Sequence, residues 1–459
     1  MNNLIVKVLK QENNKKNPLA TSKDFVYFPD KKLLEIYIGK AKDISENELR
    51  KKVSDVNWKD FEADEVRLDT KGLSSREIEL VYEMISLKSK VFEAYKVKSD
   101  KRKDLKAVKS STGKKIVSAE REKLVNAVNY CRDLVSSNAS EVHPAFMEAE
   151  AKALAAKCPD IKVKVINATQ AEKLGMGCLL AVGAESIANH SKEYHPRLVV
   201  LEFNPVLTKS SAKAEHLAIV GKGITYDTGG LCLKPTNYML DMKSDMAGSA
   251  TVLSLFKMIS TLSLSERKKI KKKITGVLAL AENAFGNMSY KPGDVLKAAN
   301  AKTVQVVDTD AEGRLALADG LAYLGTLRSK PDFVVDLATL TGSIVATLGE
   351  VAAGAMTNDE DFLKSLTGSF DEEGERLWHM PILEDCKKKT ESSIADLAHC
   401  STRPDALIAA QFLSNFIPEN SKWVHLDIAG VGFIENDGLF AYKGATGFGV
   451  KGLFRYIYS

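Results

Sequence analysis

Two short segments of the chain combine carboxylates, lysines and glycines in a pattern that suits metal binding. The first segment, 221–230, contains Lys222 and Asp227 and is followed by Lys234 and Asp245. It comes directly after a short apolar run, and ligands of open α/β sheets bind at the carboxyl ends of the strands. The aspartates offer hard oxygen ligands, and the glycines let the backbone approach a partner closely. We therefore expect a ligand site at the end of this strand.

The second segment, 308–314, reads Asp-Thr-Asp-Ala-Glu-Gly-Arg and directly follows another apolar run. If the chain stays extended here, Asp310, Glu312 and Arg314 point to the same side, because successive side chains alternate. Crowding two carboxylates is costly unless a cation holds them, and Arg314 would then face a separate anion. A plainer alternative is that the aspartates form turns, that Asp310 and Arg314 form an ordinary ion pair, and that the lysines are surface residues.

Several familiar catalytic motifs are absent from the sequence. It contains no HExxH, no GxSxG, no Walker loop and no GxGxxG after a strand. The seven histidines are dispersed, and His190 and His195 are five residues apart, so a metal site built from histidines is not expected. The chemistry is expected to depend on the carboxylates.

Length and composition indicate a globular protein with two domains. The chain has 459 residues, of which 44% are hydrophobic and 27% charged, and it is too long for one ordinary core. It has no apolar run of about eighteen residues and no N-terminal secretory signal. The six cysteines lack CxxC spacing, which is typical of a reducing compartment. We expect a cytoplasmic protein.

The first part of the chain alternates strand and helix patterns. The sequence predicts a strand over 33–38 and an amphipathic helix over 74–94. The run 96–115 is dense in Lys, Ser and Gly, which predicts an exposed loop or linker. The apolar face of 120–136 predicts a helix, so residues 119–137 are expected to lead into a second domain.

Beyond about residue 162, short apolar runs alternate with helical stretches. Strands are predicted at 198–203, 217–220, 274–280, 304–307, 333–337 and 423–428, and helices at 248–262 and 315–327. Long separations between buried strands favour crossover connections. The predicted fold class is therefore α/β: a smaller N-terminal α/β domain (1–118) and a larger C-terminal catalytic α/β domain (119–459), whose mostly parallel central sheet is flanked by helices.

The charge is unevenly distributed between these two parts. Residues 1–118 hold 27 Lys/Arg and 19 Asp/Glu, a net charge of +8, whereas the remainder holds 38 and 41, a net charge of −3. A basic first domain could contact nucleic acid or an anionic surface, or simply present a solvated face rich in lysine.

The two carboxylate segments resemble the signatures of the leucine aminopeptidase family, the cytosol aminopeptidases, which are dinuclear metallopeptidases. The run 309–315 (TDAEGRL) is similar to the most diagnostic motif of the family, and 221–230 with Lys234 and Asp245 is similar to the upstream motif. Further similar segments are 291–295, 336–342 and 425–431. The similarity extends from about Glu172 to the C-terminus, whereas the N-terminal domain resembles the family only in size and order.

The resemblance implies two divalent metal ions per subunit that share Asp227 and Glu312. Asp310, with its own backbone carbonyl, would complete the more exchangeable site, and Lys222 and Asp245 the tighter one. An amine ligates only when it is neutral, and two nearby cations would lower the Lys222 pKa far below its reference of about 10.4. Such a donor set suits Zn²⁺, Mn²⁺, Co²⁺ or Mg²⁺.

The resemblance also implies a metal-dependent leucyl aminopeptidase, a hydrolase that removes N-terminal Leu and other hydrophobic residues from peptides. A metal-bridging water would be the nucleophile, Lys234 would stabilise the oxyanion, and a bicarbonate ion on Arg314 would be the general base. The residues expected to bind the substrate are Met242, Thr339, Gly342 and Ala429. The family further implies a homohexamer.

The sequence departs from the family pattern at a few positions. Asp308 stands where the family usually has Asn, and the segment near Arg403 and Pro404 has fewer glycines than usual. Gly432 replaces a bulkier residue, which predicts a roomier pocket that admits Phe or Met beside Leu.

Two other functions are weighed against this one. A role in DNA binding or as a scaffold, through the basic N-terminal domain, could accompany the peptidase activity. A catalytically inactive relative is disfavoured, because every residue to which the resemblance assigns a metal or a catalytic role is present.

Overall fold

The computed structural model describes residues 3–10, 25–38, 44–61, 63–97, 105–205, 214–401 and 403–458. The chain divides into two compact units. The first unit comprises Met1–Asn129 with Glu435–Gly444, and the second comprises Tyr130–Ile434 with Ala445–Ser459. Among the described residues, no helix combines the length and the apolar character needed to cross a bilayer.

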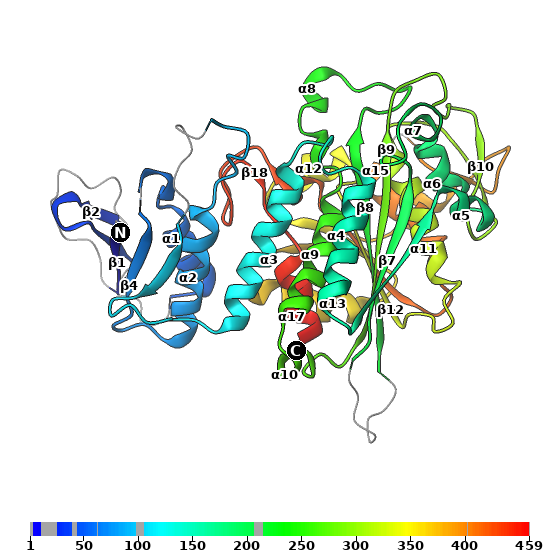
Figure 1. The fold of residues 1–459 in the computed structure, drawn as a ribbon. Helices are drawn as coiled ribbons and strands as arrows, with labels where there is room; N and C mark the ends of the chain where they lie inside the picture. Colours follow the sequence, from blue (N-terminus) through cyan, green and yellow to red (C-terminus); the bar gives the residue numbers. More distant parts are fainter. Residues whose placement is uncertain are drawn as a thin grey trace. The chain divides into compact units, whose positions relative to one another are not determined.

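The first unit is built on a five-stranded sheet with the strand order β2-β3-β1-β4-β5 (Figure 1). Its elements are β1 (Asn3–Leu9), β2 (Phe25–Phe28), β3 (Leu33–Tyr37), α1 (Glu46–Ser54), β4 (Glu65–Asp69), α2 (Ser75–Ser89) and β5 (Ala107–Ser110). Helix α2 begins with a capping box in which Ser74 and Glu77 satisfy each other's backbone N–H groups. The helix α3 (Ala119–Ser136) begins in this unit and continues past Asn129 into the second unit.

The predicted elements of the first unit are confirmed with two corrections. Strand β3 and helix α3 match their predictions, but α2 ends at Ser89, five residues before the predicted end. The interpretation of 96–115 as loop is wrong for 107–110, because these residues form β5, which pairs in parallel with β4. Residues 98–104 of that run lie outside the described residues.

The second unit contains an eight-stranded sheet with the order β14-β13-β16-β12-β8-β9-β7-β6 (Figure 1). Its strands are β6 (Ile161–Asn167), β7 (Arg197–Phe203), β8 (His216–Asp227), β9 (Lys273–Asn283), β12 (Phe333–Ala338), β13 (Ala353–Thr357), β14 (Leu377–His379) and β16 (Lys422–Asp427). The central strands β16, β12, β8 and β9 are parallel, and antiparallel pairs join β13 to β16, β7 to β9 and β6 to β7. The predicted α/β fold with a largely parallel sheet is confirmed.

Helices and short strands complete the second unit. The helices are α4 (Pro144–Lys157), α5 (Ala168–Lys173), α6 (Gly177–Val182), α7 (Ala184–Asn189), α8 (Thr236–Met239), α9 (Ala247–Thr261), α10 (Leu264–Arg267), α11 (Glu312–Leu324), α12 (Gly342–Leu348), α13 (Glu360–Glu372), α14 (Glu384–Lys388), α15 (Asp405–Ser414), α16 (Ala429–Gly432) and α17 (Val450–Tyr458). The short strands are β10 (Val295–Lys297), β11 (Thr303–Gln305), β15 (Leu397–Ala398), β17 (Phe433–Ile434) and β18 (Gly444–Ala445).

Helices α9 and α11 cover opposite faces of the central sheet. A Cβ atom at Gly221 of β8 would meet the backbone of Gly248 in α9, whereas the side chain of the preceding residue, Val220, lies against Gly320 of α11. Neighbouring residues of a strand point to opposite faces, so the two helices must lie on different sides of β8. At Gly221, the close approach predicted for the glycines is therefore an approach to α9. Strand β8 is also longer than predicted, because it continues through Gly221 to Asp227.

A buried carboxylate, Asp319, fixes α11 against helix α6 and against the loop after β10. Its Oδ2 accepts a hydrogen bond from Leu179 N (2.8 Å), its Oδ1 accepts one from Ala299 N (2.8 Å), and the residue is fully buried. We expect Asp319→Asn to lower the free energy of unfolding by about 1–3 kcal/mol, because the amide NH₂ would face a backbone N–H that needs an acceptor. Urea unfolding of metal-stripped protein measures this. The exposed Asp361→Asn, which changes the charge equally, is the control, and equal stability of the two variants would contradict the prediction.

Candidate metal centre

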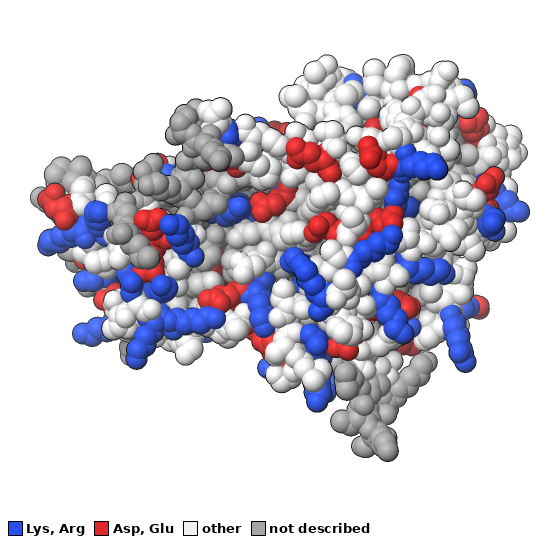
Figure 2. All heavy atoms as spheres, viewed as in Figure 1, with Lys and Arg blue, Asp and Glu red and all other residues white. Residues whose placement is uncertain are grey.

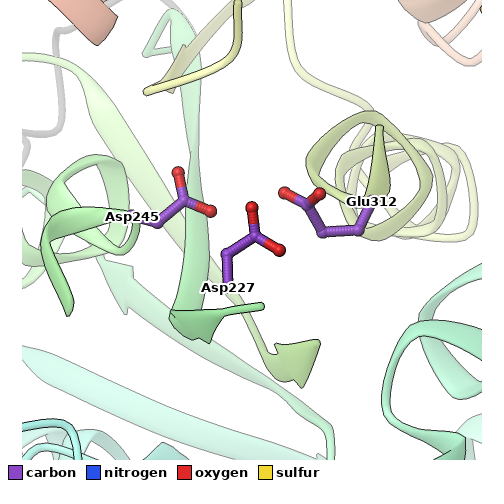
Figure 3. Close-up of side chains that lie close together, drawn as sticks. All are labelled: Asp227, Asp245 and Glu312. Atoms are coloured by element: carbon purple, nitrogen blue, oxygen red, sulfur yellow. The ribbon is translucent and has the colours of Figure 1, made fainter. Parts of the chain in front are cut away.

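Three buried carboxylates converge at the carboxyl edge of the sheet. Asp227 is the last residue of β8, Asp245 follows the 3₁₀ turn Met242–Ser244, and Glu312 is the first residue of α11. Each offers an oxygen atom, and these three atoms lie within 4.8 Å of one another. Figure 3 shows the three side chains pointing toward one another. Three carboxylates this close repel one another unless cations lie between them.

Lys222 lies beside two of these carboxylates. Its Nζ is 2.8 Å from Asp245 Oδ1 and 2.8 Å from Glu312 Oε1, and it donates a hydrogen bond to the backbone carbonyl of Thr339 (2.8 Å). The side chain is only 3% exposed. Lys222 is in β8, five residues before Asp227, and Tyr226 and Gly223 lie between them in the strand.

Lys234 occupies the other side of the centre. Its Nζ is 2.9 Å from Asp227 Oδ2 and also contacts Asp310 Oδ1. The Asp310 side chain is 33% exposed, whereas those of Asp227, Asp245 and Glu312 are at most 6% exposed. The centre is therefore closed toward the sheet and open on the side of Asp310.

The segment around Thr309 is held by neighbouring strands and loops. Asn283, at the end of β9, donates from Nδ2 to Asp227 Oδ1 (2.8 Å) and to Thr309 O (3.0 Å). The hydroxyl of Tyr290 also donates to Thr309 O (2.9 Å). The Thr309 hydroxyl donates in turn to Gly229 O (2.7 Å). These bonds join the two carboxylate segments into one rigid unit.

The loops after β12 and β16 form the next part of the site. Thr339 donates from Oγ1 to Asp245 Oδ1 (2.7 Å). Asp427, the last residue of β16, accepts from Leu340 N (3.1 Å), from Thr341 Oγ1 (2.6 Å) and from Ala429 N (3.2 Å). Because β12 and β16 are parallel neighbours, this one carboxylate holds both loops.

The residues predicted to bind the substrate lie on these loops and on the turn before Asp245. Thr339 follows β12, Gly342 begins α12 and Ala429 begins α16. Met242 begins the 3₁₀ turn that precedes Asp245. A Cβ atom at Gly432 would lie 3.4 Å from Thr339 Cγ2 and 3.4 Å from Ala247 Cβ, so Gly432 directly adjoins Thr339.

The charges of the centre change the protonation of its carboxylates. Burial and the Glu312 charge raise the pKa of Asp227 to about 7, and burial raises the pKa of Asp245 well above its usual value and that of Asp310 as well. Burial acts in the same direction on Glu312, but Lys222 and Lys234 outweigh it and lower the Glu312 pKa. The metal-free centre therefore favours protons on some of its carboxylates, and divalent cations would replace them.

The pKa values of the two lysines are also raised, which for a lysine favours the charged form. Burial disfavours both ammonium groups, but Asp245, Glu312 and Asp227 raise the pKa of Lys222. Asp227, Glu312 and Asp310 do the same for the pKa of Lys234. Both lysines are consequently ammonium groups in the absence of metal, and Lys222 has to release a proton before it can ligate.

The donor set fits divalent metal ions. Asp245 Oδ2, Glu312 Oε2 and Asn283 Oδ1 are buried and have no hydrogen-bond partner in the described part of the chain. A buried carboxylate oxygen without a donor is unfavourable, and a cation satisfies it. Carboxylates with one amine suit Zn²⁺, Mn²⁺, Co²⁺ or Mg²⁺.

The prediction that 308–314 is extended is wrong. Helix α11 begins at Glu312, so Asp310 and Glu312 do not alternate along a strand, and the two residues reach the centre from a turn and from a helix N-terminus. Arg314, the third residue of this helix, is paired with Asp405 and not with Asp310. It is buried, with Nη2 2.9 Å from Asp405 Oδ1 and Nη1 donating to His399 O (3.3 Å).

Several residues of the site were not identified from the sequence. Asn283, Tyr290, His399 and Asp405 carry no motif of their own, and each reaches the centre only through the order of the strands and loops. Asp427 lies within the similar segment 425–431, and its place at the end of a strand was the one available signal.

Comparison with known proteins identifies similar enzymes. The model of the cytosol aminopeptidase family, catalytic domain, matches residues 129–454. A probable cytosol aminopeptidase of Aquifex aeolicus is 35% identical over 447 residues, covering 96% of this chain and 85% of the relative. A probable cytosol aminopeptidase of Protochlamydia amoebophila is 38% identical over 336 residues, covering 73% of this chain and 64% of the relative.

Two solved structures share the fold over almost the whole chain. A bottromycin maturation enzyme in complex with Mn has a TM-score of 0.84 and 26% identity, covering 99% of this chain and 98% of that one. A mutant of tomato leucine aminopeptidase has a TM-score of 0.80 and 28% identity, covering 100% of this chain and 94% of that one.

Proposed function

The chain belongs to the cytosol aminopeptidase family, and from this premise we propose that it removes N-terminal residues from peptides by means of two divalent metal ions. The observation that carries the proposal is the convergence of Asp227, Asp245 and Glu312 within 4.8 Å, with buried oxygens that lack a donor among the described residues. Structural ion pairs rarely leave such oxygens bare.

The proposed ligands are those that the resemblance implies, and the placement of their side chains supports them. Asp227 and Glu312 would be shared by both ions. Lys222 and Asp245, on the buried side, would complete one site, and Asp310, on the open side, the other. When bound, the two ions supply Lewis-acid polarisation of the scissile carbonyl and of the attacking water.

Lys234 is proposed to stabilise the negative charge that develops on the carbonyl oxygen. Its neighbours keep it an ammonium group, and its side chain is 13% exposed, so it is reachable from the open side. A charged donor already in place when the charge develops stabilises the transition state more than the substrate. Thr339 and the loop held by Asp427 would orient the substrate.

The bicarbonate ion that the resemblance implies does not fit Arg314 as it stands. Asp405 already compensates the charge of the guanidinium, and Arg314 Nη1 donates a hydrogen bond to the backbone carbonyl of His399. A bound anion needs an uncompensated cation at such a buried position. No step of the reaction is therefore assigned to bicarbonate.

The test of the proposed function is hydrolysis of a fluorogenic leucine amide by metal-stripped and metal-supplied protein. We expect activity to vanish on chelation and to return with Zn²⁺, Mn²⁺ or Co²⁺, and we expect Glu312→Ala to stay inactive with every metal. Thermal unfolding gives a second readout, because ions that bind only the folded chain raise Tm by mass action. Metal-independent hydrolysis, or no hydrolysis by folded, metal-loaded protein, would refute the proposal.

We also propose a preference for Leu and other hydrophobic residues that extends to larger ones, because Gly432 leaves space beside Thr339. The native chain is expected to hydrolyse Leu, Met and Phe substrates with kcat/KM values within about tenfold, or 1.4 kcal/mol, of one another. Gly432→Met should reduce Phe hydrolysis more than Leu hydrolysis. Parallel kinetics on the three amides test this, and an advantage of Leu above tenfold in the native chain would contradict it.

We further propose that the protein is cytoplasmic and forms a homohexamer. Light scattering of the purified protein measures the number of subunits directly.

A nucleic-acid role for the basic first unit finds no support in its described residues. Many of its basic side chains are paired with acidic ones: Arg76 with Glu46 (2.9 Å), Lys106 with Asp64 (3.1 Å), Lys109 with Glu65 (2.6 Å) and Arg121 with Glu83 (2.9 Å). Both signs of charge are intermixed over this unit on the face drawn in Figure 2. Nucleic-acid binding depends on uncompensated Lys and Arg facing phosphates.

A further inference from the structure

Arg314 already has an anionic partner that belongs to the chain itself. Its Nη2 is 2.9 Å from Asp405 Oδ1, and its side chain is 3% exposed against 29% for Asp405. Nη1 donates to His399 O, and Nε is buried without a partner among the described residues. Asp405 thus neutralises a guanidinium that stands only two residues after the proposed metal ligand Glu312.

The carboxylate of Asp405 is held in this position by its own element. Asp405 is the first residue of α15, where the helix dipole favours a negative charge. The next residue donates from Ala406 N to Ser343 Oγ (3.0 Å), and Ser343 Oγ donates to Thr341 Oγ1 (3.2 Å). Thr341 is the residue bound by Asp427, so Asp405 is connected to the loop that carries Thr339.

The opposite side of Arg314 is connected, through His399, to Asp308 at the start of the same segment, 308–314. His399, whose carbonyl accepts from Arg314, lies with Nε2 2.8 Å from Asp308 O and is fully buried. The pair of Arg314 and Asp405 therefore lies between two loops of the proposed active site, the one at Asp308 and the one at Thr341.

A carboxylate and a bicarbonate ion present the same planar pair of oxygens to a guanidinium. A carboxylate tethered beside its partner has an effective concentration in the millimolar range or above, which a dissolved ion has to exceed. We propose that Asp405 is the resident anion of Arg314 and compensates its charge, so that no free bicarbonate binds there in this enzyme. The role is one of positioning and charge compensation, without contact to the substrate, and its link to catalysis rests on the proposed function.

Binding of ¹³C-bicarbonate tests the proposal independently of catalysis. By NMR line broadening, we expect no saturable binding to the native protein and saturable binding to Asp405→Gly, which exposes the guanidinium. Asp405→Glu retains the charge and is expected to behave like the native chain. Glu360→Gly removes a carboxylate from the same first position of another helix, α13, and controls for the loss at a helix N-terminus.

Hydrolysis of the leucine amide in carbonate-free buffer gives the second readout. The native enzyme is expected to be fully active and insensitive to added bicarbonate, whereas Asp405→Gly should lose about tenfold or more in kcat/KM and recover most of it with bicarbonate or formate. Saturable bicarbonate binding by the native chain, or a several-fold rise of its activity with bicarbonate, would overturn the proposal. So would a folded Asp405→Gly that neither binds the ion nor responds to it.

The native-chain measurements keep the proposal testable even if Asp405→Gly does not fold. A failure of the proposed peptidase function is recognised separately, because it would abolish hydrolysis by the native enzyme in every buffer while leaving the NMR titration interpretable.

Discussion

Replacing Lys234 by Met is expected to lower kcat by about 10²–10³-fold in the metal-loaded enzyme while leaving the fold intact. Methionine keeps most of the volume of the side chain and removes only the charged donor. The backbone of the segment does not depend on the ammonium group, since Lys234 N donates to Thr228 O (2.9 Å) in either variant.

The expected loss is large because Lys234 is the one proposed donor that is not itself a metal ligand. Asp227 and Asp310 hold its Nζ at the open edge of the centre, where the substrate carbonyl has to arrive. A donor aimed at a developing charge in a site with little water contributes mainly to the transition state, so KM should change far less than kcat.

Steady-state kinetics at saturating metal, with metal content determined in parallel, measures this effect. Lys297→Met, which removes an exposed lysine from β10, is the matched control and should behave like the native chain. If Lys234→Met with two bound metals kept kcat within about threefold, the assignment of Lys234 as the electrophile would be wrong.

Much of this fold was predictable because buried strands appear in the sequence as runs of apolar residues. Strands β7, β9, β12 and β16 lie within a residue or a few of their predicted positions. Their strand order was not predictable, since it depends on which helices fit each face. Gly221 and Gly248 illustrate this, because their contact between β8 and α9 is visible only once both elements are placed.

The residues of the candidate site likewise divide into those that the sequence predicts and those that only the structure shows. Asp227, Asp245 and Glu312 were identified from residue type and from their place after strands, and the structure brings their oxygens together. Asp405 could not be identified, because an aspartate after a proline is an ordinary helix start. The alternation of side chains that an extended 308–314 would give does not occur, because a helix begins at Glu312. Side-chain directions repeat every 3.6 residues in a helix and every two residues in a strand.

Gly313→Ala is expected to damage the metal centre without damaging the helix that carries it. A Cβ atom at Gly313 would lie 2.3 Å from Lys222 Cε and 2.6 Å from Lys222 Nζ. Contacts this short force the lysine to move. Its ammonium group is held by Asp245, Glu312 and a backbone carbonyl, so it cannot move without leaving the site.

The effect on stability and the effect on metal binding should therefore separate. Alanine is favoured over glycine inside a helix by about 1 kcal/mol, so α11 itself should not suffer. Displacing a residue that orients or completes a metal site typically lowers metal affinity by about 10–100-fold. Competition with a chromophoric chelator measures the affinity, and activity at limiting metal should fall in proportion.

Gly320→Ala provides the comparison within the same helix. Its Cβ atom would meet core side chains, namely Val220 Cγ1 at 3.2 Å, Ala279 Cβ at 3.6 Å and Val277 Cγ1 at 3.8 Å, far along α11 from Glu312. Both variants gain the same helix propensity, but Gly320→Ala leaves Lys222 in place and should keep native metal affinity. If Gly313→Ala bound metal as tightly as Gly320→Ala does, Lys222 could not be a metal ligand, and the tighter metal site would have to be built without it.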